Sequence, residues 1–181
     1  MELWDIYDKD RNKTGRTIAR GERLGEGEYH LTVHIAIFTP DGRLLIQRRV
    51  DDKPIWPGLW DMTAAGSVLA GESSAEGAHR ELYEELGLSR DFSADRPRLT
   101  VNYEDGYADF YFLTEEPPVE SLVFQECEVA EARYATLDEC IELLHADEFI
   151  PYHESFLRLL FDLRERRSTH SPRRDLMYGR K

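Results

Sequence analysis

The first part of the chain alternates short apolar runs with turn residues, a pattern that predicts β-strands. Residues 3–7, LWDIY, alternate as a half-buried strand does, and residues 8–15, DKDRNKTG, form a turn before a second strand at 16–19. Residues 29–38, YHLTVHIAIF, are apolar on both faces in their second half, which is typical of a central strand. The turn TPDG then precedes a strand at 43–48. We therefore expect a small N-terminal β-hairpin beside a larger sheet.

The C-terminal half continues with strands and ends with helical periodicity. Residues 98–103 and 107–113 flank the turn EDG as a hairpin would, and residues 128–135 predict another strand. Residues 137–144 form a short amphipathic pattern, and a stronger helix is expected to begin at Pro151. The apolar residues of that last helix recur at helical spacing: Phe156, Leu159, Leu160 and Leu163. The whole pattern predicts an α/β protein with one mixed sheet and helices packed on it.

The stretch 66–88, GSVLAGESSAEGAHRELYEELGL, carries the clearest helix signal. Ser73 followed three residues later by Glu76 is a capping box, and Gly87 is a natural left-handed residue at the other end. A helix over residues 74–86 follows. It presents a small apolar face suited to packing on a sheet, made of Ala75, Ala78, Leu82 and Leu86.

The same helix places three carboxylates together. Glu81, Glu84 and Glu85 stand at positions i, i+3 and i+4, so they share one face. Like charges at this spacing repel, unless something positive lies between them. Hard divalent cations prefer such oxygen ligands, and Mg²⁺ typically joins a few carboxylates to substrate phosphates. The alternative is a solvated, Glu-rich helix face, which is common in an acidic protein.

The full spacing favours the metal site. Glycine, glutamate, the Arg-Glu-Leu triplet, the Glu-Glu pair and the final Gly-Leu occupy nine positions whose joint chance frequency is below roughly 10⁻⁸ per start position. These positions are Gly66, Glu72, Arg80, Glu81, Leu82, Glu84, Glu85, Gly87 and Leu88. The pattern resembles, without a departure, the motif of the Nudix hydrolase superfamily. That resemblance implies an α/β/α sandwich and metal-dependent cleavage of a nucleoside diphosphate linked to another moiety.

Residue roles follow from the resemblance. It implies that the three helix glutamates bind Mg²⁺ or Mn²⁺, that the Gly66 carbonyl joins them, and that Glu72, Arg80 and Gly87 are structural. The general base is one of the helix glutamates or a glutamate from a later loop. The candidates in later loops are Glu104, Glu126, Glu128 and Glu131, of which Glu128 is slightly favoured.

Cations and tryptophans precede the motif. Residues 48–60, RRVDDKPIWPGLW, bring Arg48, Arg49 and Lys53 near a Pro-Gly turn, and such cations suit a diphosphate whose charge a metal does not fully neutralise. Trp56 is our candidate for stacking on the substrate. Charges on a sheet edge and tryptophans packed in the core are the alternative interpretations.

This segment also resembles the isopentenyl-diphosphate isomerase branch, which has the same fold. The resemblance covers residues 22–88 and includes His30, the cations and WPGLW. Isomerases need a cysteine just before the motif glycine, where this chain has Ala65. Their other metal-binding histidines fall on Arg23 and Ser67. We therefore predict a hydrolase, with an isomerase or a non-catalytic binding module as the alternatives.

Composition limits partners and location. A net charge of -13 argues against nucleic acid and anionic membranes as general partners. The expected partner, a small-molecule diphosphate, is what the resemblance implies. No basic leader precedes an apolar run, so we expect a cytoplasmic protein. We expect one domain over residues 1–166, with the hairpin in 1–28, and a basic tail at 167–181. Many proteins of the family that the chain resembles are dimers, so a homodimer is one expected assembly. The two cysteines have no metal-binding spacing and are expected to be buried: Cys127 and Cys140.

Overall fold

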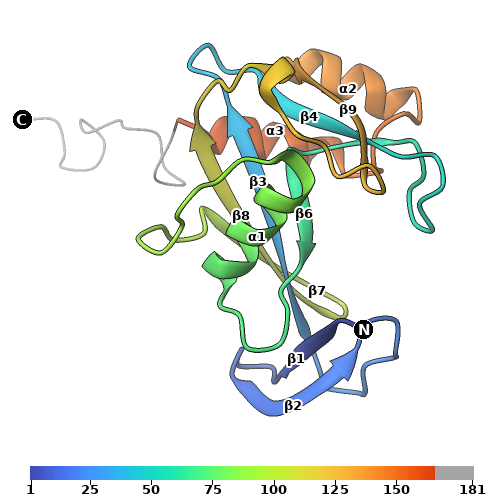
Figure 1. The fold of residues 1–181 in the computed structure, drawn as a ribbon, viewed down its shortest axis with the longest axis vertical. Helices are drawn as coiled ribbons and strands as arrows, with labels where there is room; N and C mark the ends of the chain where they lie inside the picture. The colour runs from blue at the N-terminus through green and yellow to red at the C-terminus, as the bar shows by residue number, and fades with distance from the viewer. Residues whose placement is uncertain (166–181) are drawn as a thin grey trace, which may run out of the picture.

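The computed structural model describes residues 1–165, which form an α/β/α sandwich around a mixed sheet (Figure 1). Seven strands make the sheet in this part of the chain, and its central path runs β5-β4-β3-β8-β7. Only β3 and β8 pair in parallel; the other neighbours are antiparallel. The strands are β3 (His30–Phe38), β4 (Leu44–Arg49), β5 (Trp60–Asp61), β6 (Ala64–Ser67), β7 (Leu99–Tyr103), β8 (Gly106–Thr114) and β9 (Val129–Ala135).

The sheet separates between β4 and β6, and this separation positions the site. β4 pairs with β3 only at Leu44 opposite Phe38, and its remaining partners are β5 and β9. β6 pairs with β3 through four residues, from Ala64 to Ser67. β4 and β6 do not pair with each other, and a side chain of α1 (Ser74–Leu86) joins them in place of backbone hydrogen bonds.

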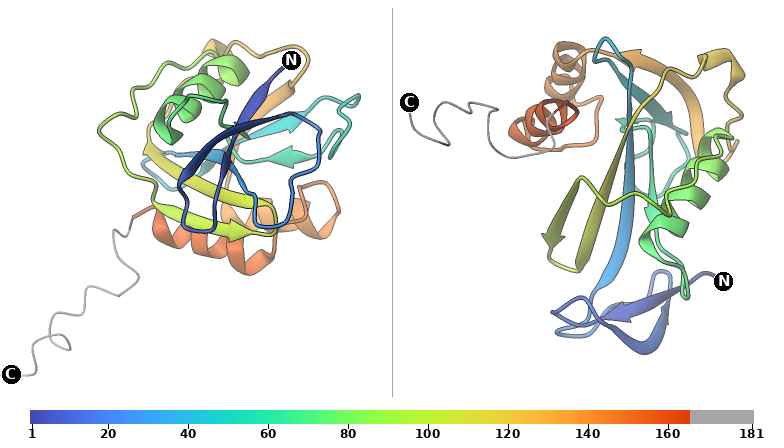
Figure 2. Two further views of the ribbon diagram at one scale, coloured as in Figure 1. Left: turned by 90° about the horizontal axis from the view of Figure 1, so that it is seen from below. Right: turned by 90° about the vertical axis from the view of Figure 1, so that its left-hand side faces the viewer.

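Helices cover both faces of the sheet (Figure 2). α1 (Ser74–Leu86) lies on one face, and α2 (Leu137–His145) and α3 (Glu154–Leu163) lie on the other. Alternate residues of β3 serve the two cores, as the strand period requires. Val33 and Ile35 pack in the core under α1, whereas Ala36 and Phe38 pack in the core under α3. The predicted sandwich is confirmed.

The predicted N-terminal hairpin is also confirmed, as β1 (Leu3–Tyr7) and β2 (Lys13–Ala19). It is fastened to the loop that precedes α1. The Ala70 N–H donates to the Leu3 carbonyl at 2.7 Å, and the Gly71 N–H donates to the Asp5 carboxylate at 2.8 Å. Lys13 donates to the Glu72 carbonyl at 2.8 Å. The hairpin is thus packed against the loop at the start of the motif.

One expectation about the C-terminal helix is wrong. α3 begins at Glu154 rather than at Pro151, because the preceding segment is held in an extended form: the Ile150 N–H donates to the Trp60 carbonyl at 2.8 Å. The helix buries Leu157, Leu160, Phe161 and Leu163, while Leu159 is 42% exposed.

Among the cysteines, Cys140 is buried as expected, but Cys127 is exposed in the loop before β9. The predicted basic tail at 167–181 lies outside the described residues. Within the described part, no helix combines the length and apolar character needed to cross a membrane.

Candidate active site

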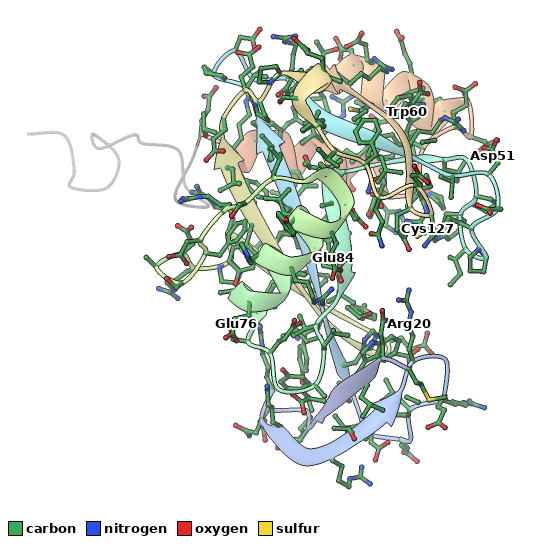
Figure 3. All side chains as sticks on the ribbon, in the orientation of Figure 1. Arg20, Asp51, Trp60, Glu76, Glu84 and Cys127 are labelled. Carbon is green, nitrogen blue, oxygen red and sulfur yellow. The ribbon has the colours of Figure 1, made fainter. Side chains whose placement is uncertain are left out.

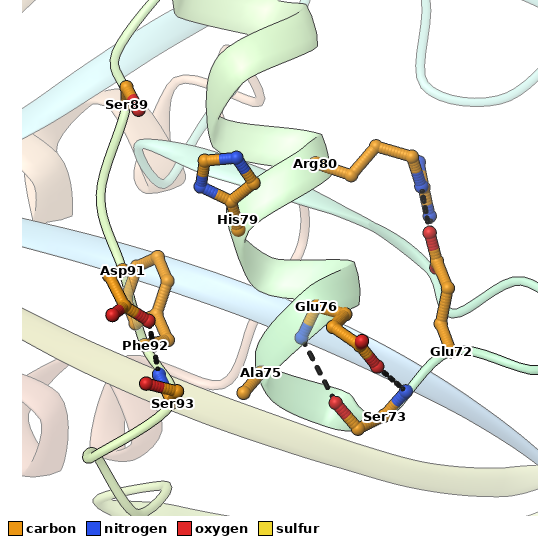
Figure 4. A pocket seen from close by; sticks show the side chains of 10 residues that line it. All are labelled: Glu72, Ser73, Ala75, Glu76, His79, Arg80, Ser89, Asp91, Phe92 and Ser93. Atoms are coloured by element: carbon orange, nitrogen blue, oxygen red, sulfur yellow. Dashed lines mark hydrogen bonds and ion pairs between the residues drawn. The ribbon is translucent and has the colours of Figure 1, made fainter.

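Local sequence fixes the position of α1. The Glu76 N–H donates to Ser73 Oγ at 3.2 Å and the Ser73 N–H donates to the Glu76 carboxylate at 2.7 Å, which completes the predicted capping box (Figure 4). Gly87 ends the helix with φ of 69°, a left-handed conformation that favours glycine. Ser74 donates to the buried Asp109 of β8 at 2.5 Å. These contacts hold the helix in register with the sheet.

Arg80 organises the acidic side chains on this helix. Its guanidinium donates to both oxygens of Glu72, at 2.8 and 3.0 Å (Figure 4). It also donates to Glu81 at 2.8 Å, to Glu84 at 3.1 Å and to the Ser67 carbonyl at 2.9 Å. Burial acts to lower the pKa of Arg80, but its hydrogen bond with Glu72 and the charge of Glu81 raise it. Arg80 is therefore a fixed cation between the loop and the helix.

Glu85 is the buried carboxylate of the site, with 3% of its surface exposed. It fills the gap between β4 and β6, where it accepts from Gln47 Nε2 at 2.9 Å and from the Ala65 N–H at 3.3 Å. Burial raises the pKa of Glu85 well above its usual range, and the charge of Glu81 is the next cause. A buried carboxylate with only neutral donors is unfavourable unless it binds a proton or a cation.

Glu81 lies directly over the backbone at Gly66. A Cβ placed on Gly66 would stand 2.1 Å from the carboxyl group of Glu81, so only glycine permits this approach. Burial also raises the pKa of Glu81, although Arg80 opposes that shift. The motif glycine and the helix glutamate therefore meet, as a shared metal site requires.

No group of three His, Cys, Asp or Glu within residues 1–165 is already gathered as a metal site. The reason is visible in the contacts, since Arg80 holds Glu81 and Glu84 while Gln47 holds Glu85. The chemistry nevertheless fits a hard divalent cation. All three donors are carboxylates, two of them have raised pKa values, and one, Glu85, has no cationic partner among residues 1–165.

Across the opening between α1 and the loop that follows β4, two of the three predicted phosphate-binding cations are paired with acids. Lys53 forms an ion pair with Glu128. Arg48 pairs with Asp51 at 2.8 Å and with Glu131 at 3.0 Å. Arg49 donates to a backbone carbonyl in the following loop at 3.3 Å. Figure 3 shows Asp51 in this loop on the side of the opening away from Glu84 and α1.

The two tryptophans have different places. Trp60 is 8% exposed and belongs to the core under α3. Trp56 is 45% exposed and has φ of 53°, an unusual left-handed conformation for a bulky residue. Trp56 is therefore accessible to a ligand, whereas Trp60 is a packing residue.

The four candidate loop glutamates also differ in their positions and contacts. The charge of Glu128 contributes to the raised pKa of Glu85, so the two side chains are close enough to interact. Glu131 pairs with Arg48. Glu104 lies beside the N-terminal segment in the β7–β8 turn, and Glu126 is exposed.

Comparison with known proteins identifies the family. The NUDIX domain model matches residues 28–160. The chain belongs to the Nudix hydrolase family. It is 44% identical over 170 residues to an uncharacterised Nudix hydrolase of Listeria monocytogenes, covering 94% of this chain and 99% of that protein.

Three further proteins are similar to this Nudix hydrolase in sequence or in fold. Nudix hydrolase 3 of Arabidopsis thaliana is 35% identical over 83% of this chain, which corresponds to 22% of that longer protein. An isopentenyl-diphosphate Delta-isomerase of Streptomyces griseus is 35% identical over 52% of this chain and 50% of that protein. A Deinococcus radiodurans protein, DR0079, shares the fold with a TM-score of 0.71 at 20% identity, over 87% of this chain and 98% of that one.

Sequence reasoning missed several side chains at this site. Asp61 is 4% exposed, and burial raises its pKa to about 6. Tyr152 donates to it at 3.0 Å. The charge of Asp61 also contributes to the raised pKa of Glu85. The available signal was polarity inside an apolar pattern, because Gln47 and Asp61 are the polar residues of β4 and β5 that are fully buried.

Arg20, at the end of the hairpin, is the other residue that was missed. It pairs with Glu2 at 2.7 Å, and this hydrogen bond, together with the charges of Glu128 and Glu81, raises its pKa. Figure 3 shows Arg20 across the opening from Glu84 and Cys127. The hairpin therefore brings a cation to the carboxylates, and no local motif in the sequence indicates this.

Proposed function

We propose that this Nudix hydrolase cleaves the pyrophosphate bond of a nucleoside diphosphate linked to another moiety, or of a related organic diphosphate, with Mg²⁺ or Mn²⁺. The observation that carries the proposal is Glu85. It is buried, has no cationic partner among its contacts, and lies close enough to three other acids for their charges to raise its pKa. Such a group stabilises the folded protein only when something positive reaches it.

In this proposal the metal is held by the Gly66 carbonyl and by the carboxylates of Glu81, Glu84 and Glu85. The cation would supply positive charge to the pyrophosphate and acidify a water molecule. Arg80 keeps Glu72 and the Ser67 carbonyl as partners, so it continues to brace the loop when the helix glutamates turn to the metal.

Glu128 is the proposed general base. It reaches the site from the loop before β9, and its ion pair with Lys53 holds both side chains at the opening. Lys53, Arg48, Arg49 and Trp56 are the proposed substrate contacts. When a diphosphate binds Lys53, Glu128 loses its cationic partner and becomes a better proton acceptor.

Neither alternative explains the site as well. Ala65 supplies no thiol at the position where an isomerase needs its acid. The remaining isomerase-like features are ones that would serve to bind a diphosphate in either kind of enzyme. A non-catalytic binding module has no need for clustered carboxylates, since their repulsion lowers stability.

The test is a chromatographic assay for the phosphomonoester products, and for any phosphate or pyrophosphate released with them, from nucleoside diphosphate derivatives, nucleoside triphosphates and organic diphosphates, with and without Mg²⁺ or Mn²⁺. We expect metal-dependent release that disappears in Glu84→Gln, while the melting temperature stays near that of the wild type. Release that persists in Glu84→Gln, or that does not need the metal, would contradict the proposal.

A further inference from the structure

Gln47 is a buried polar residue to which the proposed reaction gives no role. It lies on β4, and only 2% of its surface is exposed. Leu45 packs in the core under α1 and Ile46 in the core under α3, so the period of the strand directs Gln47 back to the α1 side. A buried amide is unfavourable without hydrogen bonds, so its contacts have to account for its presence.

The amide of Gln47 contacts one oxygen of Glu85. Gln47 Nε2 donates to Glu85 Oε2 at 2.9 Å, and the Ala65 N–H donates to the same oxygen at 3.3 Å. Glu85 Oε1 receives no hydrogen bond from residues 1–165. Two donors from different strands thus converge on a single oxygen. They fix the rotation of the carboxyl group and leave its other oxygen open to a ligand.

The contact with Glu85 also determines which way the amide points. Gln47 Oε1 is buried and has no hydrogen-bond partner among the described residues. Turning the amide over would bring Oε1 against the carboxylate of Glu85, and two acceptors repel each other. Asp61, directly opposite Gln47 on β5, is a carboxyl group as well. The N–H contact with Glu85 is therefore kept at the expense of an unsatisfied oxygen.

Gln47 differs in charge from the residue that holds the other two helix glutamates. Arg80 donates to Glu81 at 2.8 Å and to Glu84 at 3.1 Å, so a metal has to compete with a guanidinium for both. A neutral amide orients Glu85 without neutralising it, and the negative charge remains available to a cation. Removing a group that orients a metal ligand commonly lowers metal affinity by about 10- to 100-fold.

We propose that Gln47 is a positioning residue of the metal site, which holds Glu85 Oε2 and thereby presents Oε1 to the cation. The inference rests on the proposed function, because it takes Glu85 as a metal ligand. Gln47 itself contacts neither the metal nor the diphosphate in this proposal. Its removal weakens metal binding and leaves the binding of the diphosphate unchanged.

Binding of Mn²⁺ alone tests the proposal without turnover. Gln47→Met keeps the length of the side chain and removes both polar atoms of the amide. We expect Mn²⁺ to bind at least about tenfold more weakly than to the wild type, as measured from the electron paramagnetic resonance signal of free Mn²⁺. Gln47→Asn, whose shorter amide does not reach Glu85, should give the same result and serves as the test if Gln47→Met does not fold.

Thr63→Val is the matched control for a purely structural effect. Thr63 is fully buried in the same part of the sheet, where it donates to the Leu45 carbonyl at 2.6 Å and accepts from the Ile37 N–H at 2.9 Å. It does not hold Glu85. We expect Thr63→Val to lower the melting temperature and to bind Mn²⁺ as the wild type does. Equal weakening of Mn²⁺ binding in Thr63→Val and Gln47→Met would show that Gln47 acts only through the stability of the sheet, and would overturn the proposal.

Turnover gives a second readout. For a diphosphate that the wild type cleaves, the Mg²⁺ concentration at half-maximal rate should rise about tenfold in Gln47→Met. The kcat at saturating Mg²⁺ and the KM for the diphosphate should stay within about threefold. A fall in kcat that saturating Mg²⁺ does not restore would contradict a role in metal binding.

The Mn²⁺ measurement also separates the inference from the proposed function. If the wild type binds no Mn²⁺, the proposed function fails and the inference fails with it. If the wild type binds Mn²⁺ and both Gln47 variants bind it equally well, only the positioning role is refuted, and the proposed function stands.

Discussion

The two sides of the opening are built in different ways. We call them the helix wall, formed by α1 and the loop before it, and the loop wall, formed by the loops that follow β4 and precede β9. On the helix wall, Arg80 joins Glu72, Glu81, Glu84 and the Ser67 carbonyl, and all these partners lie within 13 residues of it in sequence. On the loop wall, Lys53 pairs with Glu128, 75 residues away, and Arg48 pairs with Glu131, 83 residues away, as well as with the nearby Asp51. The helix wall is a local structure that the tertiary fold only has to present, whereas the loop wall exists only after β4 and β9 have paired.

The walls also differ in the charge that they leave for a ligand. The helix wall keeps a buried carboxylate without a cationic partner, Glu85. On the loop wall, Lys53 and Arg48 are both in ion pairs. A bound cation therefore stabilises the helix wall without displacing a partner. On the loop wall, a diphosphate first has to displace the acids that pair with Lys53 and Arg48. Substitutions on the first wall should change kcat, and substitutions on the second should mainly change KM.

The largest expected effect is on the helix wall. Glu85→Gln keeps the shape and the hydrogen-bonding capacity of the side chain but removes the charge that we assign to the metal. We expect kcat to fall by about 10³-fold. The melting temperature of the metal-free protein should be unchanged or higher, because a buried carboxylate is removed. Metal-dependent formation of the cleavage products and a melting curve measure both, with the exposed Glu142→Gln of α2 as the control. Activity within a few-fold of the wild type would remove Glu85 from the site.

Glu128→Gln decides whether the loop wall contributes to the chemistry. If Glu128 is the general base, kcat falls by about 10²-fold and the pH dependence of kcat on its acid side changes. If Glu128 is only the partner of Lys53, the substitution frees that cation, and KM falls while kcat is kept. A pH-rate profile of both enzymes separates the two results, and the second would contradict our assignment.

Asp61 tests how much folding stability is lost at pH 7 when a carboxyl group is buried between the two walls. Its folded pKa of about 6 is above the ordinary value of 3.8. Its protonation therefore stabilises the fold fully below about pH 3.8, and this stabilisation is lost as the pH rises through 6. We expect Asp61→Asn to be more stable than the wild type at pH 7 by up to about 3 kcal/mol, and this advantage to vanish near pH 4. Denaturant unfolding at both pH values measures the difference, and an advantage independent of pH would contradict the assigned pKa.

Arg49→Ala addresses the cation of the loop wall whose hydrogen bond is to a backbone carbonyl and whose charge acts on the buried Asp61. Loss of a cation at the diphosphate should raise KM by about tenfold with little change in kcat. Arg43→Ala, just before the same strand, is the control, because Arg43 pairs with Asp41 and Glu116 away from the opening. A fall in kcat with unchanged KM would place Arg49 among the groups that act in the chemical step instead.

The smallest effect is expected at the hairpin. Arg20 is 58% exposed and already paired with Glu2, so its contribution to substrate binding is screened. We expect Arg20→Ala to raise KM by roughly two- to threefold at low salt and to have no effect at high salt. Arg16→Ala is the control, because Arg16 lies on β2, just before Arg20, and is paired with Glu28. Equal effects of the two variants would show that Arg20 acts only through net charge.

The sequence by itself determined the features whose causes are local. The capping box at Ser73 and Glu76, the left-handed Gly87 and the shared face of the helix glutamates all depend on spacings of a few residues. The strand alternation of β3, from apolar on one face to apolar on both, likewise follows from neighbouring residues. These signals were sufficient for the fold class and for the helix wall.

The tertiary structure decided the rest, because the interacting groups come from distant parts of the chain. The pairing of Lys53 with Glu128, the burial of Glu85 beside Gln47, and the approach of Arg20 each require strands that are far apart in sequence to meet. The late start of α3 has the same origin: a hydrogen bond from Ile150 to β5 competes with helix formation. Local patterns determine which elements form, whereas the charge and burial of a side chain depend on what the other elements place around it.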